Sequence, residues 1–339
     1  MKAVRTQLNM TDKVPLHEHV PLETPFVLAV EPSGVCNLKC KFCVHSLPVM
    51  PETGAGGRLR VLMSDTVFEK IIQDLKGFNA PLKLVYFSQI GEPLLNKRTP
   101  EMIKRLHKEK LTQKTTVFSN AIPLTEERSL ALVDSGLSRI KISINGLSED
   151  DYERNCGVRI DFDNLVHQIT YLFKNRKNLV VQIKTLDRLL MPGGEERFYR
   201  VFGNICDQIN IERIFPIFSE VDYDSLYFGE SEKPESRFAF AQSSVKICAL
   251  PFYRMAVAAD GTVNLCYTDI EDLNIKDSSL KEIWESTRRK KLLRNLLQQR
   301  YEGISKKCST CVCGHEQADE KDDLYPYREE VLQRLASVK

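Results

Sequence analysis

Short apolar runs alternate with amphipathic segments from residue 26 to about residue 218 of this 339-residue chain. Six runs are apolar or β-branched over nearly their whole length: FVLAVE (26–31), LKLVYFS (82–88), TTVFS (115–119), RIKISIN (139–145), LVVQIK (179–184) and INIERIF (210–216). Strands that are covered on both faces have this composition, because neither face needs polar side chains. The pattern therefore predicts six buried strands of a parallel sheet.

Helical periodicity fills the segments between these strands. SDTVFEKIIQDLKGF begins after a possible cap at Ser64 or Asp65, and TPEMIKRL offers Thr99 as a cap with a proline at the first helical position. LTEERSLALVDSG ends at Gly136, as a left-handed C-terminal glycine would require. Alternating strands and helices form parallel sheets with right-handed crossovers. Six units are fewer than the eight of a closed barrel, so we expect an α/β fold: a partial (β/α)6 TIM-like barrel, open along one side.

The composition changes after the sixth strand. RMAVAADGTVNLC contains two β runs joined by Asp260-Gly261, a pair typical of a type I′ hairpin, and SSLKEIWESTRRKKLLRNLLQQ has the period of one long amphipathic helix. Its basic run, residues 288–291, predicts a solvated helix face, with a docking site for a redox partner as the alternative. The expected divisions are an N-terminal extension (1–25), the barrel (26–218), a polar linker (219–240), a smaller domain (241–315) and a charged C-terminal helix (316–339).

Charge and composition exclude some classes of function. The chain carries 48 basic and 46 acidic side chains, so its net charge of +2 gives no electrostatic reason to expect nucleic acid or anionic lipid as a partner. No apolar run has the length of a membrane span, and the first residues lack the apolar core of a signal peptide. We therefore expect a cytoplasmic protein, in a compartment that keeps thiols reduced.

Ten cysteines in such a compartment call for a use other than disulfides. They form two groups: Cys36, Cys40 and Cys43 in the first quarter, and Cys248, Cys266, Cys308, Cys311 and Cys313 in the last. Only Cys156 and Cys206 are isolated in the sequence. The grouping predicts metal or redox sites.

The first group, in CNLKCKFC, offers three thiolates within eight residues directly after the first predicted strand. Three thiolates can hold three irons of a cubane cluster and leave the fourth iron without a protein ligand. An open coordination position marks a catalytic metal centre, and the carboxyl face of a barrel is where active sites form. The alternative is a zinc knuckle in which His45 supplies a fourth ligand.

CNLKCKFC resembles the Cx3CxΦC signature of the radical S-adenosylmethionine superfamily, with Phe42 as the aromatic residue before the last cysteine. The resemblance implies a [4Fe-4S] cluster on Cys36, Cys40 and Cys43. It also implies that S-adenosylmethionine chelates the open iron through its amino and carboxylate groups. An electron from the reduced cluster then cleaves the sulfonium and gives a 5′-deoxyadenosyl radical.

Three further segments resemble motifs of the same superfamily. IGEPL follows the second strand as the GGEP motif does, so Glu92 would bind the methionyl amino group and Gly91 would allow a close backbone approach. FSNAIPL resembles the TNG segment, with Asn120 matched and an alanine in place of the glycine. ISING, at the end of the fourth strand, resembles the segment that contacts the ribose, through Ser143 and Asn145.

The second group of cysteines resembles the C-terminal SPASM/twitch extension of these enzymes, which carries auxiliary iron–sulfur clusters. The full SPASM form uses seven cysteines for two clusters, and five are present here, enough for one. The implied ligands of a second [4Fe-4S] cluster are Cys248, Cys266, Cys308 and Cys311, with Cys313 as a substitute for Cys311. A structural zinc site is the alternative for these residues.

A fully ligated second cluster can serve as an electron acceptor, an electron relay or a structural element. The resemblance therefore implies an iron–sulfur oxidoreductase that dehydrogenates a sugar, an aminocyclitol or another small polar substrate. One alternative is a peptide maturase that forms thioethers, epimers or crosslinks, although only 35 residues precede Cys36, too few for a peptide-recognition domain. The other is a non-enzymatic electron-transfer or zinc-stapled binding protein.

The sequence also indicates a class of redox partner and several candidate substrate contacts. A flavodoxin or a ferredoxin is the expected reductant. Candidate substrate contacts at the carboxyl ends of the strands are Gln89, Lys184, Arg213 and Arg254. The substrate, the net reaction and the oligomeric state stay open.

Overall fold

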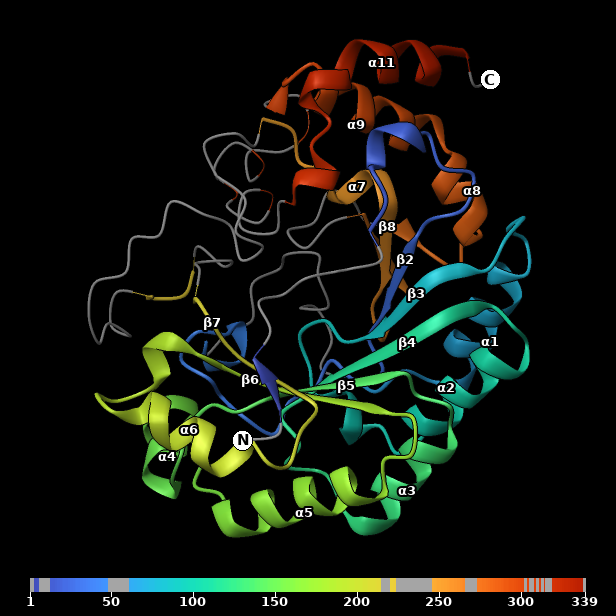
Figure 1. The fold of residues 1–339 in the computed structure, drawn as a ribbon. Helices are drawn as coiled ribbons and strands as arrows, with labels where there is room; N and C mark the ends of the chain where they lie inside the picture. Colours follow the sequence, from blue (N-terminus) through green and yellow to red (C-terminus); the bar gives the residue numbers. More distant parts are fainter. Residues whose placement is uncertain are drawn as a thin grey trace.

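The computed structural model describes residues 3–5, 13–47, 61–214, 220–223, 246–265, 273–301 and 319–337, with residues 304, 308, 311 and 314. One sheet runs through these residues in the order β1-β7-β6-β5-β4-β3-β2-β8-β9-β10 (Figure 1). Its strands are β1 (Val4–Arg5), β2 (Val27–Val30), β3 (Leu82–Phe87), β4 (Thr112–Ser119), β5 (Arg139–Ser143), β6 (Val180–Leu186), β7 (Gln208–Glu212), β8 (Arg254–Val257), β9 (Thr262–Asn264) and β10 (Leu273–Asn274).

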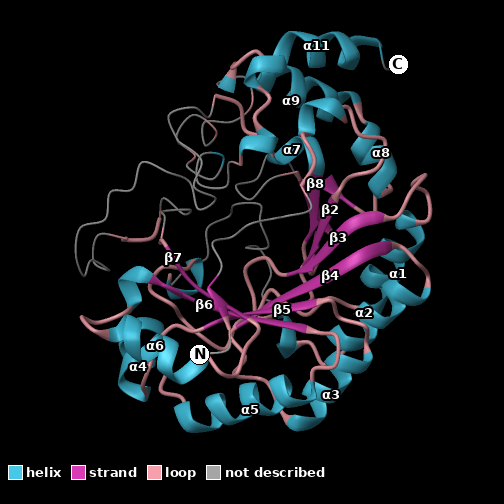
Figure 2. Ribbon diagram, viewed as in Figure 1, coloured by secondary structure: helices cyan, strands magenta, loops and turns pink. Residues whose placement is uncertain are grey.

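The six predicted strands are confirmed as β2 to β7, each parallel to the next. The helices between them lie along the outer side of the curved sheet (Figure 2). They are α1 (Asp65–Leu75), α2 (Thr99–Lys108), α3 (Glu126–Asp134), α4 (Glu149–Cys156), α5 (Phe162–Asn175) and α6 (Gly194–Phe202). Side chains on the helix-facing side of the strands, such as Val85, Ile140 and Ile183, are fully buried. The partial (β/α)6 barrel is therefore confirmed.

Two of the predicted helix boundaries are confirmed, and the predicted capping residues determine them. Ser64 accepts a hydrogen bond from the N–H of Val67, so it is the N-cap of α1, and Gly136 follows α3 with a φ of +81°. Thr99 is not a cap, because α2 begins at Thr99 itself. Its hydroxyl instead donates to the carbonyl of Pro93 at 2.7 Å, which ties the helix to the preceding 3-10 turn.

The C-terminal part of the chain extends the barrel sheet. Strand β8 pairs in parallel with β2 along the whole of β2, and β9 then pairs with β8 as the predicted hairpin. The predicted type I′ turn is wrong. Ala258 donates to Thr262, Gly261 donates to Ala258, and only Gly261 has a positive φ, of +90°. The register of β8 with β9 leaves three residues in the loop, for which a type I turn followed by a left-handed glycine is the common solution.

The long helix predicted over residues 278–299 is two helices, α8 (Leu280–Glu285) and α9 (Thr287–Leu297). Ser286 between them is extended, and its side chain accepts from the N–H of Arg289. This break turns Arg289 inward: it is 4% exposed, its guanidinium lies 3.2 Å from the centre of the Trp284 ring, and it donates to Trp284 O and Pro251 O. The predicted solvated basic face is therefore wrong at Arg289, whereas Arg288 and Lys291 are exposed.

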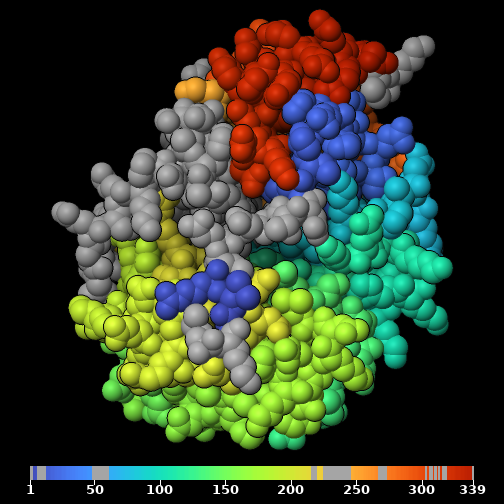
Figure 3. Space-filling view, in the orientation of Figure 1, coloured from blue at the N-terminus to red at the C-terminus, as the bar shows by residue number. Residues whose placement is uncertain are grey.

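The N-terminal segment packs against the C-terminal one. The indole N–H of Trp284 donates to Leu22 O at 2.8 Å, and His17 stacks on Tyr327 with 3.5 Å between ring centres. In the space-filling view one group of blue N-terminal residues accordingly lies against the red C-terminal ones (Figure 3). The C-terminal helix α11 (Arg328–Ser337) buries Val331, so only part of its surface is solvated as predicted.

Most of the predicted linker lies outside the described residues. No helix among those described has the length and apolar composition needed to cross a bilayer.

Candidate active site

The three cysteines of the first group lie on the loop that follows β2, at the carboxyl edge of the sheet. The N–H of Cys43 donates to Cys40 O at 2.9 Å, which closes a turn between these two cysteines. The N–H of Lys39 donates to Cys156 O at 2.9 Å, at the C-terminal end of α4. The loop is thus folded on itself and attached to a helix end that offers unpaired carbonyls.

All three thiols are at least partly buried, and none forms a disulfide. Burial raises the pKa of Cys36 to about 12 and also raises the pKa of Cys43. The pKa of Cys40 is raised first by its hydrogen bond to Cys156 and then by burial. The nearby thiols add to these shifts, since like charges would meet on ionisation. These shifts favour the neutral thiols, and positive charge held among the sulfurs would oppose them.

The turn that contains Gly91 lies against the cysteine loop. The N–H of Glu92 donates to Val35 O at 2.8 Å. A Cβ atom at Gly91 would lie 1.9 Å from Ser33 O, so only glycine allows this approach. The predicted role of Gly91 in a close backbone contact thus has a physical basis in the structure.

Glu92 connects this turn to the loop after β4. Its Oε1 accepts from Leu94 N at 3.0 Å and from Ser119 Oγ at 2.8 Å, and its Oε2 accepts from Asn120 N at 2.7 Å. Glu92 is 3% exposed, and burial raises its pKa to about 7 although these donors lower it. Oε2 has one lone pair beyond the bond to Asn120, so it can still accept a hydrogen bond from a bound cation.

Asn120 reaches the cysteine loop directly, since its Nδ2 donates to Asn37 Oδ1 at 2.8 Å. The next residue, Ala121, has a φ of +63°. A glycine adopts this left-handed conformation without strain, so the alanine that stands here in place of the glycine of the TNG segment holds it at an energetic cost.

Asn145 and Cys156 both lie beside Cys40. The Asn145 Nδ2 and the Cys156 Sγ are each 3.5 Å from the Cys40 Sγ. Cys156, which is isolated in the sequence, thus lies beside the cysteine loop in the structure, because α4 brings it back across 116 residues of chain. Ser143, the other predicted ribose contact, is the last residue of β5 and is half-buried. Phe42 is partly buried against the core, and its carbonyl accepts from Tyr223.

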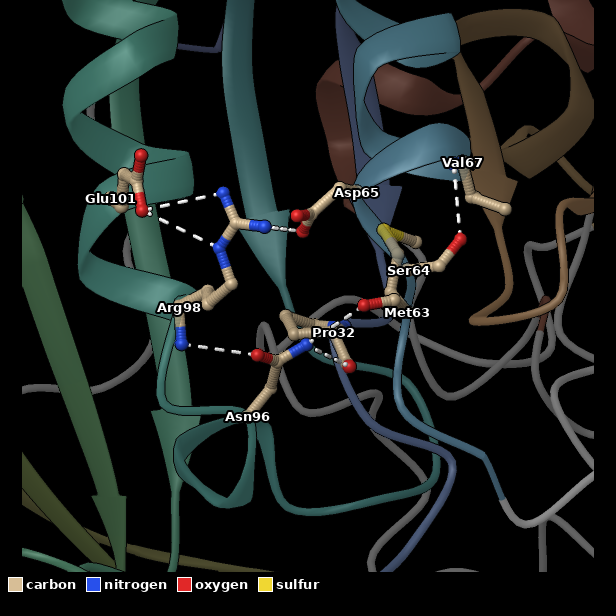
Figure 4. Close-up of polar contacts among 8 residues, drawn as sticks. All are labelled: Pro32, Met63, Ser64, Asp65, Val67, Asn96, Arg98 and Glu101. Atoms are coloured by element: carbon tan, nitrogen blue, oxygen red, sulfur yellow. Dashed lines mark hydrogen bonds and ion pairs between the residues drawn. The ribbon is translucent and has the colours of Figure 1, made fainter.

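Asn96, a polar residue that the sequence did not single out, connects two segments of this site. Asn96 is 5% exposed, and its Nδ2 donates to Pro32 O at 2.9 Å and to Met63 O at 3.2 Å (Figure 4). Its Oδ1 accepts from Arg98 N at 3.0 Å. The segment between β2 and the cysteines is thereby tied to the start of α2. Nothing local in the sequence distinguishes this asparagine from a turn residue.

The inner side of the barrel carries charged and amide side chains near the carboxyl ends of β5 to β7. Glu212 accepts from Lys141 Nζ at 2.5 Å through Oε1 and from Lys184 Nζ at 2.8 Å through Oε2. Gln182 donates to Asn210 beside them at 3.0 Å. These positions alternate with the apolar ones that face the helices. Of this group, the sequence singled out only Lys184.

The other predicted substrate contacts are dispersed. Gln89 and Arg213 are half-buried just beyond β3 and β7. Arg254 pairs in register with Val27, the first residue of β2, so it lies at the amino end of the strands. Its prediction as a carboxyl-end contact is wrong, because β8 runs parallel to β2 and begins at Arg254.

In the second cysteine group, Cys248 lies close to the C-terminal cysteine segment. A Cβ atom at Gly314 would lie 3.2 Å from Cys248 Sγ, so the C-terminal cysteine segment passes beside Cys248. Cys248 and Cys308 both contribute to raising the pKa of Tyr301 to about 12, after the larger effect of burial. Cys308 and Cys311 are partly buried. Cys266 and Cys313 lie outside the described residues.

The residues present fit iron–sulfur centres. Within the described part of the chain, no three Cys, His, Asp or Glu side chains converge on a point where one metal ion could be held. A cubane does not require such convergence, because each cysteine binds a separate iron. The buried thiols of the loop supply the soft sulfur ligands that iron clusters use. His45, the alternative zinc ligand, is buried in the 3-10 turn that follows Cys43.

Two family models match the chain. The radical SAM superfamily matches residues 30–197, and an iron–sulfur cluster-binding domain, SPASM, matches residues 248–312. The first match covers the cysteine loop and the barrel from the end of β2 into α6, and the second covers the C-terminal cysteines from Cys248 to Cys311.

Individual proteins are similar at low identity. GTP 3′,8-cyclase of Clostridium botulinum is 24% identical over 316 residues, which cover 83% of this chain and 94% of the relative. PqqA peptide cyclase of Bradyrhizobium diazoefficiens is 31% identical over 135 residues, 40% of this chain and 32% of the relative. The crystal structure of BtrN in complex with AdoMet and 2-DOIA has a TM-score of 0.52 at 16% identity, and covers 84% of this chain and 92% of BtrN.

Proposed function

Because the chain belongs to the radical SAM superfamily, with a C-terminal SPASM domain, we propose that it oxidises a small polar molecule such as a sugar or an aminocyclitol. A radical SAM domain binds a [4Fe-4S] cluster and S-adenosylmethionine, and a SPASM domain binds further iron–sulfur clusters. When bound, these groups supply a 5′-deoxyadenosyl radical that removes a hydrogen atom and a second centre that takes up one electron. The substrate loses a hydrogen atom, a proton and an electron, which amounts to a two-electron dehydrogenation.

The residues of the chain have distinct roles in this proposal. Cys36, Cys40 and Cys43 hold the first cluster and leave one iron open to the amino and carboxylate groups of S-adenosylmethionine. Gly91 lets the backbone approach, and Glu92 accepts a hydrogen bond from the methionyl ammonium through Oε2. Burial of this carboxylate strengthens its attraction for a cation, since the effective dielectric constant is low there.

The nucleoside part of S-adenosylmethionine is assigned to the neighbouring strand ends. Asn120 and Ser143 lie at the ends of β4 and β5. Asn145 is assigned to the ribose as well, although its amide also lies within 3.5 Å of Cys40 Sγ. Phe42, the aromatic residue before the last cysteine of the loop, is assigned to the same binding site and is partly buried against the core.

The observation that carries the choice of substrate is the network of Lys141, Glu212 and Lys184. Glu212 is 4% exposed and is held by two ammonium groups, so the inner wall presents fixed charges beside the carboxyl ends of the strands. A hydroxyl-rich substrate can exchange hydrogen bonds with such a wall without leaving buried charges unpaired. An apolar substrate could not form hydrogen bonds with these side chains.

The second centre is proposed to be a fully ligated [4Fe-4S] cluster on Cys248, Cys308 and Cys311 together with Cys266, with Cys313 as the substitute. A reduced flavodoxin or ferredoxin is the proposed source of the electron that starts each turnover. Replacing Cys308 by alanine is expected to leave S-adenosylmethionine cleavage intact and to abolish the oxidised product. The protein would then retain about four of about eight irons.

The alternative is maturation of a peptide, which the likeness to PqqA peptide cyclase over 135 residues favours. The two functions are separated by supplying reconstituted protein, without oxygen, with carbon-deuterated sugars, aminocyclitols and peptides. Deuterium is expected in 5′-deoxyadenosine from a member of the first two groups. Transfer from a peptide alone would refute the proposal.

Lys184→Met provides a variant for the same assay. The change keeps the length of the side chain and removes the charge, so it is expected to raise KM for the substrate at least tenfold without changing S-adenosylmethionine binding. Lys177→Met is the control, because Lys177 pairs with Asp134 on the surface and is 71% exposed. Equal effects of the two changes would contradict a substrate site at Lys184.

A further inference from the structure

Glu31 is a buried carboxylate that none of the assigned roles uses. It follows β2 directly, is 1% exposed, and continues the pairing of β2 with β8 by donating its N–H to Val257 O at 2.9 Å. Its two oxygens point to different parts of the chain. Oε1 accepts from the N–H of Ile90 at 3.1 Å, and Oε2 accepts from the N–H of Ala259 at 3.2 Å.

These two donors belong to the two loops that flank Glu31 in the sheet. Ile90 begins the turn that contains Gly91 and Glu92, after β3. Ala259 lies in the hairpin between β8 and β9, which belongs to the part matched by SPASM. A single side chain therefore joins the turn assigned to S-adenosylmethionine with the C-terminal domain, across 228 residues of sequence.

The chemistry of the link requires a carboxyl group. Each oxygen faces a backbone N–H, and a carboxyl group can accept at both oxygens. A glutamine can accept at only one, and its amide nitrogen would face the other N–H and repel it. Where water is excluded, the N–H that faces the amide nitrogen would have no hydrogen-bond acceptor. The loop that carries this N–H would therefore shift.

We propose that Glu31 is a positioning residue that fixes the Ile90–Glu92 turn to the β8–β9 hairpin, so that S-adenosylmethionine binding and the placement of the C-terminal domain depend on each other. The inference rests on the proposed role of Gly91 and Glu92 in binding the cosubstrate. In physical terms, ordering the turn around S-adenosylmethionine also orders the hairpin, and freeing the hairpin weakens binding by the same factor.

The chain offers a matched control in Asp74. This carboxylate is 7% exposed at the end of α1, and its Oδ2 accepts from the N–H of Leu280 at 3.0 Å, at the start of α8. It therefore also joins the barrel to the C-terminal part through a backbone N–H. Its position is on the helical side of the sheet, away from the cysteine loop, so its loss loosens the same two parts without touching the turn.

The first test compares Glu31→Gln with Asp74→Ala in reconstituted full-length protein, because alanine removes the only acceptor that Asp74 offers to the Leu280 N–H. We expect Glu31→Gln to weaken S-adenosylmethionine binding about tenfold, as for the loss of one buried hydrogen bond. It should also diminish the change that S-adenosylmethionine causes in the electron paramagnetic resonance spectrum of the reduced cluster. Asp74→Ala should bind within twofold of wild type. Binding of Glu31→Gln within twofold of wild type, or equal weakening in both variants, would overturn the inference.

The second test needs no variant and so does not depend on whether Glu31→Gln folds. Hydrogen–deuterium exchange of the wild-type protein is measured with and without S-adenosylmethionine. Exchange is expected to slow in residues 88–92 and also in residues 257–262. Protection of the turn alone would overturn the coupling but leave the assignment of Gly91 and Glu92 intact. Protection of neither segment would overturn both. No substrate is present in either test, so an error in the proposed oxidation would not affect the result.

Discussion

Replacing Gly91 by alanine tests the closest backbone contact of the candidate active site. The new Cβ would lie 1.9 Å from Ser33 O and 2.7 Å from Val35 O, whereas real Cβ atoms essentially never come within 3.0 Å of such atoms. Both neighbours are backbone atoms, so no change of rotamer relieves the clash. The turn and the cysteine loop must therefore separate by about 1 Å. That separation stretches the bond from Glu92 N to Val35 O beyond its limit.

A displacement of this size sets the expected loss of rate. Misplacing a reacting group by about 1 Å can reduce a rate by about 100-fold. We expect Gly91→Ala to form 5′-deoxyadenosine about 100 times more slowly than wild type in a single anaerobic turnover, measured by chromatography. Overpacking should cost about 1–3 kcal/mol of unfolding free energy, so the protein should still fold. The iron content should be unchanged, because the cysteines remain.

Gly77→Ala is the control for this experiment. A Cβ atom there would meet its nearest neighbour, Asp74 O, at 3.2 Å, which a small movement can relieve. Its cleavage rate should stay within twofold of wild type. If Gly91→Ala cleaved S-adenosylmethionine at the wild-type rate, with the usual change in the cluster spectrum, the argument from the close approach would be refuted.

Three further changes test other parts of the structure. Arg289→Lys should lower the unfolding free energy by about 1–3 kcal/mol in denaturant titrations, because lysine cannot both stack on Trp284 and donate to several carbonyls. Burial raises the pKa of Glu31 to about 7, so the folded state keeps a proton that the unfolded state loses near pH 4.5. In metal-free protein Glu31 should thus cost up to about 3 kcal/mol of stability between pH 4.5 and 7. The buried Glu92, whose pKa is also raised to about 7, contributes over the same range, so Glu31→Gln should remove only the part of the slope that belongs to Glu31. Cys156→Ala should lower the potential of the first cluster by about 20–60 mV in a redox titration, since a thiol beside the Cys40 sulfur can donate to it once iron is bound.

Each of these changes has a control and an opposing outcome. Arg288→Lys, on the exposed side of α9, should leave stability unchanged, and an equal loss in the two arginine variants would contradict the burial argument. A pH slope in Glu31→Gln as steep as that of the wild type would assign the whole titration to other groups such as Glu92. Cys206→Ala removes a thiol that donates to Phe202 O, so an equal potential shift there would remove Cys156 from any tuning role.

The features that sequence predicted are those determined by short stretches of chain. Buried parallel strands are rich in apolar and β-branched residues, so β2 to β7 could be found from composition although β5 to β7 carry polar side chains on their inner face. The spacing in CNLKCKFC contains the cluster chemistry within eight residues. The N-cap at Ser64 depends only on its neighbours and holds, whereas the turn at Asp260-Gly261 depends on the register of β8 with β9 and was predicted wrongly.

The features that sequence missed depend on contacts between distant residues. Glu31 gains its role only because β8 lies beside β2. Cys156 approaches Cys40 because α4 returns to the carboxyl edge of the sheet, and Glu212 on β7 accepts from a lysine of β6 and from a lysine of β5, one strand further. Arg289 becomes buried because the helix breaks at Ser286. Nothing in the local pattern around these residues differs from that of an ordinary surface charge or core thiol.

The addition of β8 to the free edge of β2 has a practical consequence for dissecting the molecule. A fragment that ended at residue 214 would keep every ligand proposed for S-adenosylmethionine, yet the edge of β2 that pairs with β8 would be unpaired over its full length. Such an edge invites pairing with another chain, so the fragment should aggregate rather than behave as a minimal enzyme. The radical SAM and SPASM regions are separate in the sequence, but the radical SAM region alone would lack β8 beside β2 and has no other strand to replace it.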